Sequence, residues 1–199
     1  EDTSRQQELF RGLKVTEDSE FCEEHMGRYP VVSLSLKGVK GTGFVEAYRS
    51  LAGTISKLAQ DFRWLDGPEL EEDERDFLNM LIKYKYLRDP ACIDYVGQSL
   101  SFLCRLLRKR FSNGRKPVLL VDEYDVPLQK AAVGGYYEPM SELIGSLLGD
   151  VLKTNDDICK GILTGCLRAT KEGIFTGLNN LSIDTVLTRR SSLCTAIGF

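Results

Sequence analysis

The chain has 199 residues, of which 42% are hydrophobic, so it can form one globular domain with a substantial core and is not globally disordered. Its formal net charge of −3 gives no general electrostatic reason for nucleic-acid binding. No apolar run is long enough to cross a membrane and no secretory signal is evident, so we expect a cytoplasmic protein.

Cysteine and histidine usage gives little support for a metal site. The six cysteines are scattered and none forms a Cys-x-x-Cys pair, which favours reduced, mostly buried thiols over a zinc site. The single histidine, His25, follows Glu23 and Glu24 and has Cys22 nearby. This pattern favours a surface histidine beside acids over a weak metal site.

The N-terminal part of the chain leads into a predicted strand. Residues 1–13 carry a few apolar side chains that suit a short helix or turn, and residues 27–30 predict a turn. Residues 30–36 predict a strand, and residues 37–43, with three glycines, predict a loop.

Three helices are predicted next, because apolar residues recur at spacings of three and four. The first covers residues 44–62, the second begins in the acidic run 69–76, and the third covers residues 93–111. Acids in a first turn and cations in a last turn complement the helix dipole, so the acidic run 69–76 is most simply a solvated helix start. The third helix ends in four basic residues, Arg105, Arg108, Lys109 and Arg110. The helix dipole is enough to explain this cluster, so we expect no direct nucleic-acid binding by this chain.

The stretch that follows is the most informative one. Residues 118–121 are four consecutive apolar residues, and they run into Asp122 and Glu123. Such a run predicts a strand buried on both faces. An unpaired buried carboxylate is very costly, so the two acids belong at the strand's C-terminal end, where ligands bind in open α/β sheets.

The remaining elements continue the alternation of strand and helix. Residues 133–137 predict a loop, 138–153 a helix, 161–165 a short strand, 168–174 a helix or turn, and 183–187 an extended piece. This order favours parallel strands joined by right-handed crossovers, which is an α/β fold.

Several blocks of sequence resemble the AAA-ATPase-like family, which often precedes a PD-(D/E)XK-type nuclease domain in bacterial proteins. The matching blocks are residues 25–30, 121–128, 163–168 and 171–180, so the resemblance covers nearly the whole chain. It implies a P-loop NTPase-like parallel sheet flanked by helices, within a single domain over 1–199 in which residues 44–111 are a helical excursion. It also implies Mg²⁺-dependent ATP binding and hydrolysis, a possible nuclease-like domain beyond this chain, and possible oligomerisation.

The resemblance assigns roles to particular residues. Asp122 would hold Mg²⁺, and Glu123 would be the catalytic acid or base that orients the attacking water. Thr164 would place a polar group near the γ-phosphate, while Arg168 and Lys171 would face phosphate. From the residues alone, Thr164 can also be a strand-end hydroxyl that caps the next turn, and Arg168 and Lys171 are more simply surface charges.

Asp125 has two open interpretations: it supports the metal-binding acid, or it begins a turn with Pro127. Asn179 and Asn180 suit turns and receive no chemical role.

One feature of the family is missing. The sequence contains no Gly-x-x-x-x-Gly-Lys-[Ser/Thr], and the glycine-rich residues 38–43 do not supply it. In the family this phosphate-binding loop lies upstream of the region matching residues 9–10. We therefore expect the Walker A loop and its strand to lie outside this chain. The chain would then be a fragment that alone binds ATP weakly or not at all and has no substantial turnover.

Two classes of function remain. The first is the Mg²⁺-and-hydrolysis half (Walker B and sensor) of an ATPase core. The second is a non-catalytic interaction module that keeps the fold and uses it as a scaffold. The intact Asp122–Glu123 pair favours the first. A metal nuclease is a weaker third idea, because it needs an acid-x-Lys on an adjacent strand and no convincing one is present.

Overall fold

The computed structural model describes residues 8–111, 115–153, 156–166 and 182. The predicted segments at 168–174 and 183–187 lie outside these ranges. The chain divides into two compact units, one made of Glu1–Tyr29 and Asn179–Phe199 and the other of Pro30–Leu178.

The first unit contains the short 3-10 helix η1 (Lys14–Glu17) and helix α2 (Ser19–His25). Asp18 begins α2, since its side chain accepts a hydrogen bond from the Phe21 N–H at 3.0 Å. The sequence does not predict α2, because the acidic residues of this helix obscure any apolar stripe. His25 lies 3.1 Å from the Tyr29 hydroxyl, and the described residues contain no cluster of three or more metal-ligating side chains.

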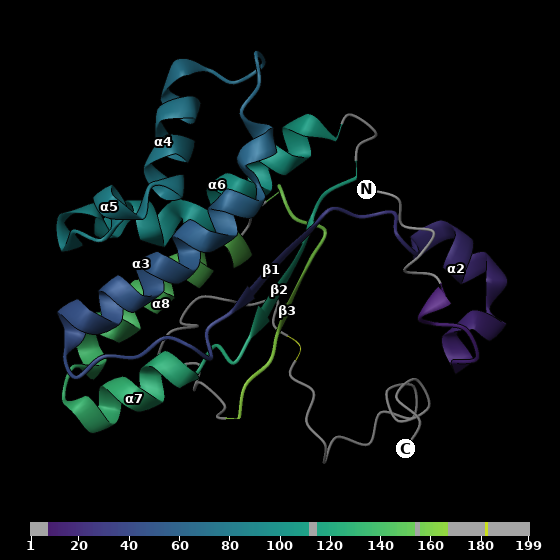
Figure 1. The fold of residues 1–199 in the computed structure, drawn as a ribbon. Coiled ribbons are helices and arrows are strands. Elements are labelled where there is room, and N and C mark those ends of the chain that lie inside the picture. The colour runs from purple at the N-terminus through teal and green to yellow at the C-terminus, as the bar shows by residue number, and fades with distance from the viewer. Residues whose placement is uncertain (1–7, 112–114, 154–155, 167–181, 183–199) are drawn as a thin grey trace. The chain divides into compact units, whose positions relative to one another are not determined.

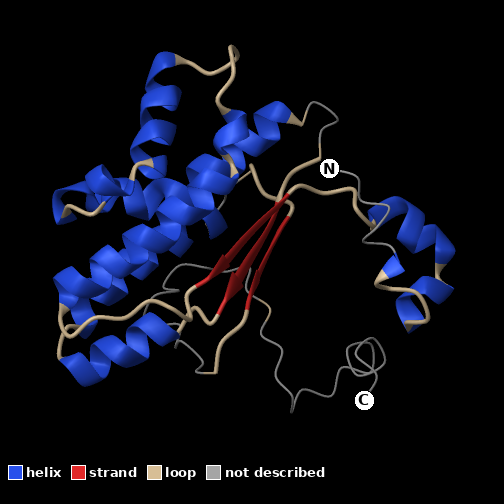
Figure 2. Cartoon of the chain, in the orientation of Figure 1, coloured by secondary structure: helices blue, strands red, loops and turns tan. Residues whose placement is uncertain are grey.

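The second unit is built on a parallel sheet of three strands in the order β1-β2-β3 (Figures 1 and 2). The strands are β1 (Val31–Ser35), β2 (Val118–Asp122) and β3 (Lys160–Leu163). The register pairs Ser35 with Asp122 and Val121 with Leu163. The α/β prediction with parallel strands is therefore confirmed, and the carboxyl ends of all three strands meet at one edge.

Helices fill both connections between the strands. The first connection contains α3 (Phe44–Asp61), η2 (Arg63–Leu65), α4 (Glu72–Ile82), α5 (Tyr84–Leu87), η3 (Pro90–Cys92) and α6 (Ile93–Arg110), and the second contains α7 (Val126–Gly134) and α8 (Tyr137–Leu152).

The prediction of a loop at residues 133–137 is wrong at both ends. Val133 and Gly134 belong to α7, Gly135 ends that helix with a φ of 73°, and Tyr137 begins α8. A short helix with proline in its first turn presents too few apolar repeats to be recognised from periodicity.

Among the residues that the structure describes, helices cover one face of the sheet. Leu119 and Val121 of β2 are buried, whereas Val118 and Leu120 are half-buried, so the prediction of a strand buried on both faces is wrong. Because strand order follows chain order, both crossovers run in the same direction, and right-handed crossovers then place their helices on the same side. Figure 1 shows α3, α6 and α8 together on that side, where the core lies.

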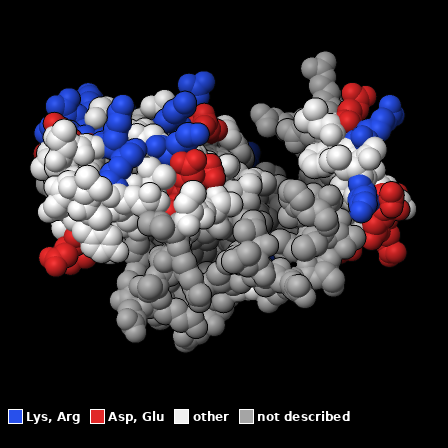
Figure 3. All heavy atoms as spheres, turned by 90° about the horizontal axis from the view of Figure 1, so that it is seen from below, with Lys and Arg blue, Asp and Glu red and all other residues white. Residues whose placement is uncertain are grey.

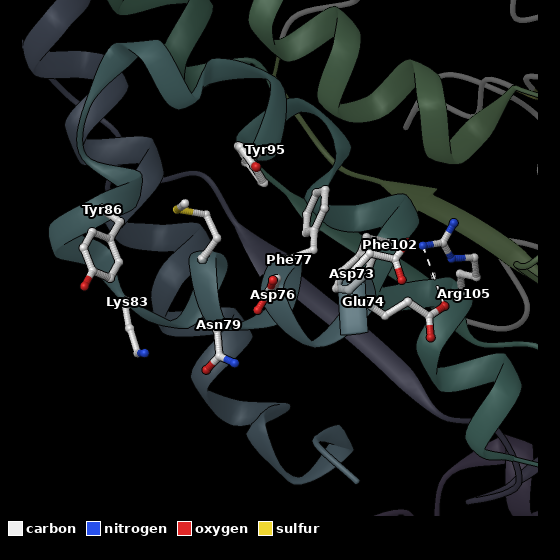
Figure 4. A pocket seen from close by; sticks show the side chains of 11 residues that line it. Asp73, Glu74, Asp76, Phe77, Asn79, Lys83, Tyr86, Tyr95, Phe102 and Arg105 are labelled. Carbon is white, nitrogen blue, oxygen red and sulfur yellow. Dashed lines mark ion pairs between the residues drawn. The ribbon is translucent and has the colours of Figure 1, made fainter. Parts of the chain in front are cut away.

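The basic end of α6 is used within the fold, as its ion pairs show. Its four basic side chains all have acidic partners: Arg105 and Lys109 pair with Glu74, Arg108 pairs with Asp157, and Arg110 pairs with Glu69. Glu74 departs from the expected solvated helix start, because its side chain is only 5% exposed. Figure 4 shows the Arg105 side chain pointing toward it.

Replacing Lys109 with methionine should lower the free energy of unfolding by about 1–3 kcal/mol at pH 7, because the buried Glu74 carboxylate then loses its closest donor. The hydrogen bond from Lys109 holds the pKa of Glu74 below its ordinary value of 4.5. The stabilisation from this ionised pair is fully present above about pH 4.5 and disappears as the pH falls through the lowered folded-state pKa of Glu74. The decrease in the free energy of unfolding caused by Lys109→Met should therefore be smaller at acidic pH.

Urea unfolding at pH 7 and pH 4 measures this difference. Arg110→Met is the matched control, because its partner Glu69 is 65% exposed and the pair should contribute less than about 1 kcal/mol. Equal decreases in the free energy of unfolding for the two variants would show that burial of Glu74 does not strengthen its ion pair.

The cysteines are less buried than expected. Of the five that the structure describes, all are free thiols, yet only Cys104 is buried while Cys159 and Cys166 are exposed. Burial raises the pKa of the Cys104 thiol to about 12, so this group is inert at neutral pH.

Candidate functional site

Polar side chains from all three strands meet at the carboxyl edge of the sheet. Asp122 ends the central strand, Ser35 ends β1, and Thr164 directly follows β3. The Thr164 hydroxyl donates to Asp122 Oδ1 at 2.5 Å, and the Ser35 hydroxyl lies 3.4 Å from Asp122 Oδ2. A hydroxyl bound to an ionised carboxylate at this distance is a short, charge-assisted hydrogen bond. The two outer strands therefore orient the carboxylate of the middle one.

Glu123 has an unusual backbone conformation for its residue type. Its φ of 53° lies in the left-handed region, which a non-glycine residue adopts at a cost of about 1–3 kcal/mol. The surrounding hydrogen bonds enforce this turn: the Tyr124 N–H donates to the Thr164 carbonyl at 3.1 Å, and the Val126 N–H donates to the Glu123 carbonyl at 3.2 Å. The result is an abrupt end to β2 that leaves the Glu123 side chain one-third exposed at the sheet edge.

The loop after β1 brings a cation to the same edge. Lys37 Nζ lies 3.9 Å from Glu123 Oε1, and the Lys37 side chain is 77% exposed, so this pair is weak and easily separated. The loop itself is fixed, because Lys130 Nζ donates to the Val39 carbonyl at 2.9 Å and the Tyr136 hydroxyl donates to the Gly41 carbonyl at 2.8 Å.

The donor set at this edge fits a hard divalent cation such as Mg²⁺. Asp122 offers carboxylate oxygens at an exposed position, with the Thr164 and Ser35 hydroxyls beside it. Mg²⁺ prefers oxygen ligands and is usually bound by one or two carboxylates, with water and substrate phosphates completing its shell. The described residues contain no larger cluster of metal-ligating side chains, and a site of this kind needs none.

The structure brings together three of the five predicted site residues. Asp122, Glu123 and Thr164 lie within one network, since the Glu123 N–H is 3.4 Å from the Thr164 hydroxyl oxygen. Arg168 and Lys171 lie outside the described residues. Ser35 and Lys37 were missed, although their position at the end of a parallel strand is the signal that could have found them.

The other described surfaces do not include the acidic residues of the candidate site. A hollow of about 590 Å³ lies on the helices, with Phe77, Tyr95 and Phe102 among its lining residues, and Figure 4 shows Glu74 and Arg105 facing each other in it. Neither Asp122 nor Glu123 lines this hollow.

Seen from below the view of Figure 1, the described surface carries both acidic and basic side chains (Figure 3). None of the helices in the described ranges combines the length and apolar character needed to cross a membrane.

Comparison with known proteins gives one clear match. The protein-family model described as "Predicted AAA-ATPase" matches residues 1–175. Comparisons with curated proteins and with solved structures gave no significant match.

Proposed function

The chain belongs to the predicted AAA-ATPase family, and from that membership we propose that it supplies the Mg²⁺-binding and water-activating side chains of an ATP-hydrolysing site. Membership itself suggests an ATP-binding, ATPase-like function. The observation that carries the finer proposal is the oriented Asp122 carboxylate, which accepts a 2.5 Å hydrogen bond from Thr164 at the exposed carboxyl edge of the sheet.

In this proposal each residue has a separate task. Asp122 holds Mg²⁺, which would neutralise negative charge on the phosphate oxygens when bound. Thr164 keeps the Asp122 carboxylate in place. Glu123, at the end of the same strand, accepts a hydrogen bond from the attacking water and then its proton. Arg168 and Lys171 are proposed to meet the phosphate groups as cations.

Metal binding gives the most direct test. Mn²⁺, a paramagnetic substitute for Mg²⁺, can be titrated into the protein while free Mn²⁺ is followed by electron paramagnetic resonance. Asp122→Asn should weaken Mn²⁺ binding by at least about tenfold, because it removes a charged oxygen ligand from a site with few others.

Glu72→Gln is the matched control, since it removes one negative charge from the exposed first turn of α4. It should leave the Mn²⁺ affinity unchanged. If Asp122→Asn and Glu72→Gln bind Mn²⁺ equally well, the edge is not a cation site, and the chain is better explained as a scaffold that retains the fold.

A further inference from the structure

We propose that Asp125 is a positioning residue that fixes the segment after β3, so that the Thr164 hydroxyl meets Asp122. This inference rests on the proposed cation site at Asp122. It assigns Asp125 a task that acts through Thr164 and not through direct contact with cation or substrate.

The Asp125 side chain is buried and turned toward the end of β3. The residue is only 2% exposed, and although it stands at the start of α7 its side chain does not cap that helix. Its Oδ2 instead accepts hydrogen bonds from the Cys166 N–H at 3.0 Å and from Gln129 Nε2 at 2.6 Å. Burying a carboxylate is costly, and charge-assisted hydrogen bonds of this kind compensate for it. One carboxylate therefore joins the beginning of α7 to the chain two residues beyond Thr164.

Gly165 makes this close approach possible. A Cβ atom added at Gly165 would lie 2.6 Å from Asp125 Oδ1 and 2.8 Å from Cε1 of Tyr124, distances that real Cβ contacts essentially never show. The residue between Thr164 and Cys166 thus has to be glycine for the segment to lie against Asp125 as it does. This steric observation is independent of the hydrogen bonds.

The segment is held on the strand side as well. The Thr164 N–H donates to the Val121 carbonyl at 2.9 Å, and the Thr164 carbonyl accepts from the Tyr124 N–H at 3.1 Å. These bonds extend the β2–β3 pairing by one residue, and the bond from Cys166 to Asp125 stops the chain from turning away immediately afterwards. Thr164 is therefore fixed on both sides, which is the condition for a 2.5 Å hydrogen bond to Asp122. Removing a partner that hydrogen-bonds a metal ligand directly, as Thr164 does with Asp122, typically changes metal affinity by about 10–100-fold. We expect the lower end of this range for Asp125, which acts through Thr164.

The test combines Mn²⁺ titration with amide hydrogen exchange. Asp125→Ala should weaken Mn²⁺ binding by about tenfold and should speed exchange of the Cys166 amide proton, because that proton loses its acceptor. Asp125→Asn keeps one acceptor oxygen for the Cys166 N–H and should restore most of the affinity. A role in general stability alone would not give this rescue together with a local change at Cys166.

Two further variants keep the result decisive. Gly165→Ala retains every polar group but displaces residues 164–166 from Asp125, so it should also weaken Mn²⁺ binding by about tenfold. If Asp125→Ala does not fold, the result for Gly165→Ala alone tests the positioning role. Lys109→Met loses stability on other helices and should keep the wild-type Mn²⁺ affinity.

The outcomes separate the two proposals. If Asp122→Asn weakens Mn²⁺ binding but folded Asp125→Ala and Gly165→Ala do not, the positioning role is overturned and the cation site stands. If Asp122→Asn has no effect, the cation site fails and the positioning role fails with it. Faster exchange at Cys166 in Asp125→Ala with wild-type Mn²⁺ affinity would reduce Asp125 to a loop anchor and would also overturn the inference.

Discussion

Replacing Glu123 with glutamine should lower kcat for ATP hydrolysis by roughly 10²–10⁴-fold while leaving Mg²⁺-ATP binding within about threefold, because a general base contributes about this much to rate and little to substrate binding. Glutamine has nearly the same shape as glutamate but cannot accept a proton from water at neutral pH. The hydrogen bonds that enforce the left-handed turn come from the backbone and from Thr164, so the substitution leaves them in place.

The measurement is steady-state phosphate release beside equilibrium nucleotide binding, made with the natural full-length protein that contains residues 1–199. Glu138→Gln is a charge-matched control in the exposed first turn of α8 and should hydrolyse ATP at the wild-type rate. Hydrolysis by Glu123→Gln at more than about a tenth of the wild-type rate would exclude Glu123 as the general base.

Replacing Gly41 with alanine should lower the free energy of unfolding by about 3 kcal/mol, at the upper end of the usual cost of overpacking. The added Cβ would lie 2.3 Å from the Ala47 backbone nitrogen and 2.8 Å from the Glu46 carbonyl carbon. These are backbone atoms in the first turn of α3, so no side-chain rotation can relieve the collision. The loop must move, and the hydrogen bond from the Tyr136 hydroxyl to the Gly41 carbonyl is then lost.

Urea unfolding of Gly41→Ala beside Gly38→Ala provides the comparison. Gly38 lies in the same loop, but a Cβ there meets no atom within 4 Å, so its substitution should change stability by less than about 1 kcal/mol. Similar stabilities for the two variants would mean that the loop adjusts freely, and that Lys37 is not held near Glu123 by its packing.

The sequence predicts those helices and strands that depend on residues close to one another in the chain. The apolar stripe from Phe44 to Phe62 defines α3, and the run into Asp122 and Glu123 defines both the central strand and the position of the two acids at its end. Parallel order follows from the alternation of strands and helices. The resemblance predicts a polar group at the end of the next strand, and the structure shows that this group, Thr164, lies beside Asp122. Each of these features needs only nearby residues or a known pattern.

The features that the sequence did not predict depend on contacts between distant residues. Ser35 became a site residue only through its register with Asp122. The left-handed turn at Glu123 has no signature, because glutamate seldom adopts it and the enforcing bonds come from Thr164. Glu74 was assigned to a solvated helix start, since the donor that compensates its burial lies on another helix.

The register between β1 and β2 has a further consequence for ligand binding at the proposed site. Ser35 and Asp122 are separated by 87 positions in the chain, and Asp122 and Thr164 by 42. A ligand that needs all three strand ends in place therefore binds only chains in which both long connections are closed, and each closure has an entropy cost of its own. Its binding free energy consequently adds to the stability of the whole sheet and not to that of one segment. If the proposed site binds a cation or nucleotide, a higher concentration of that ligand should lower the fraction of chains that unfold or are proteolysed, because the bound ligand links distant parts of the polypeptide.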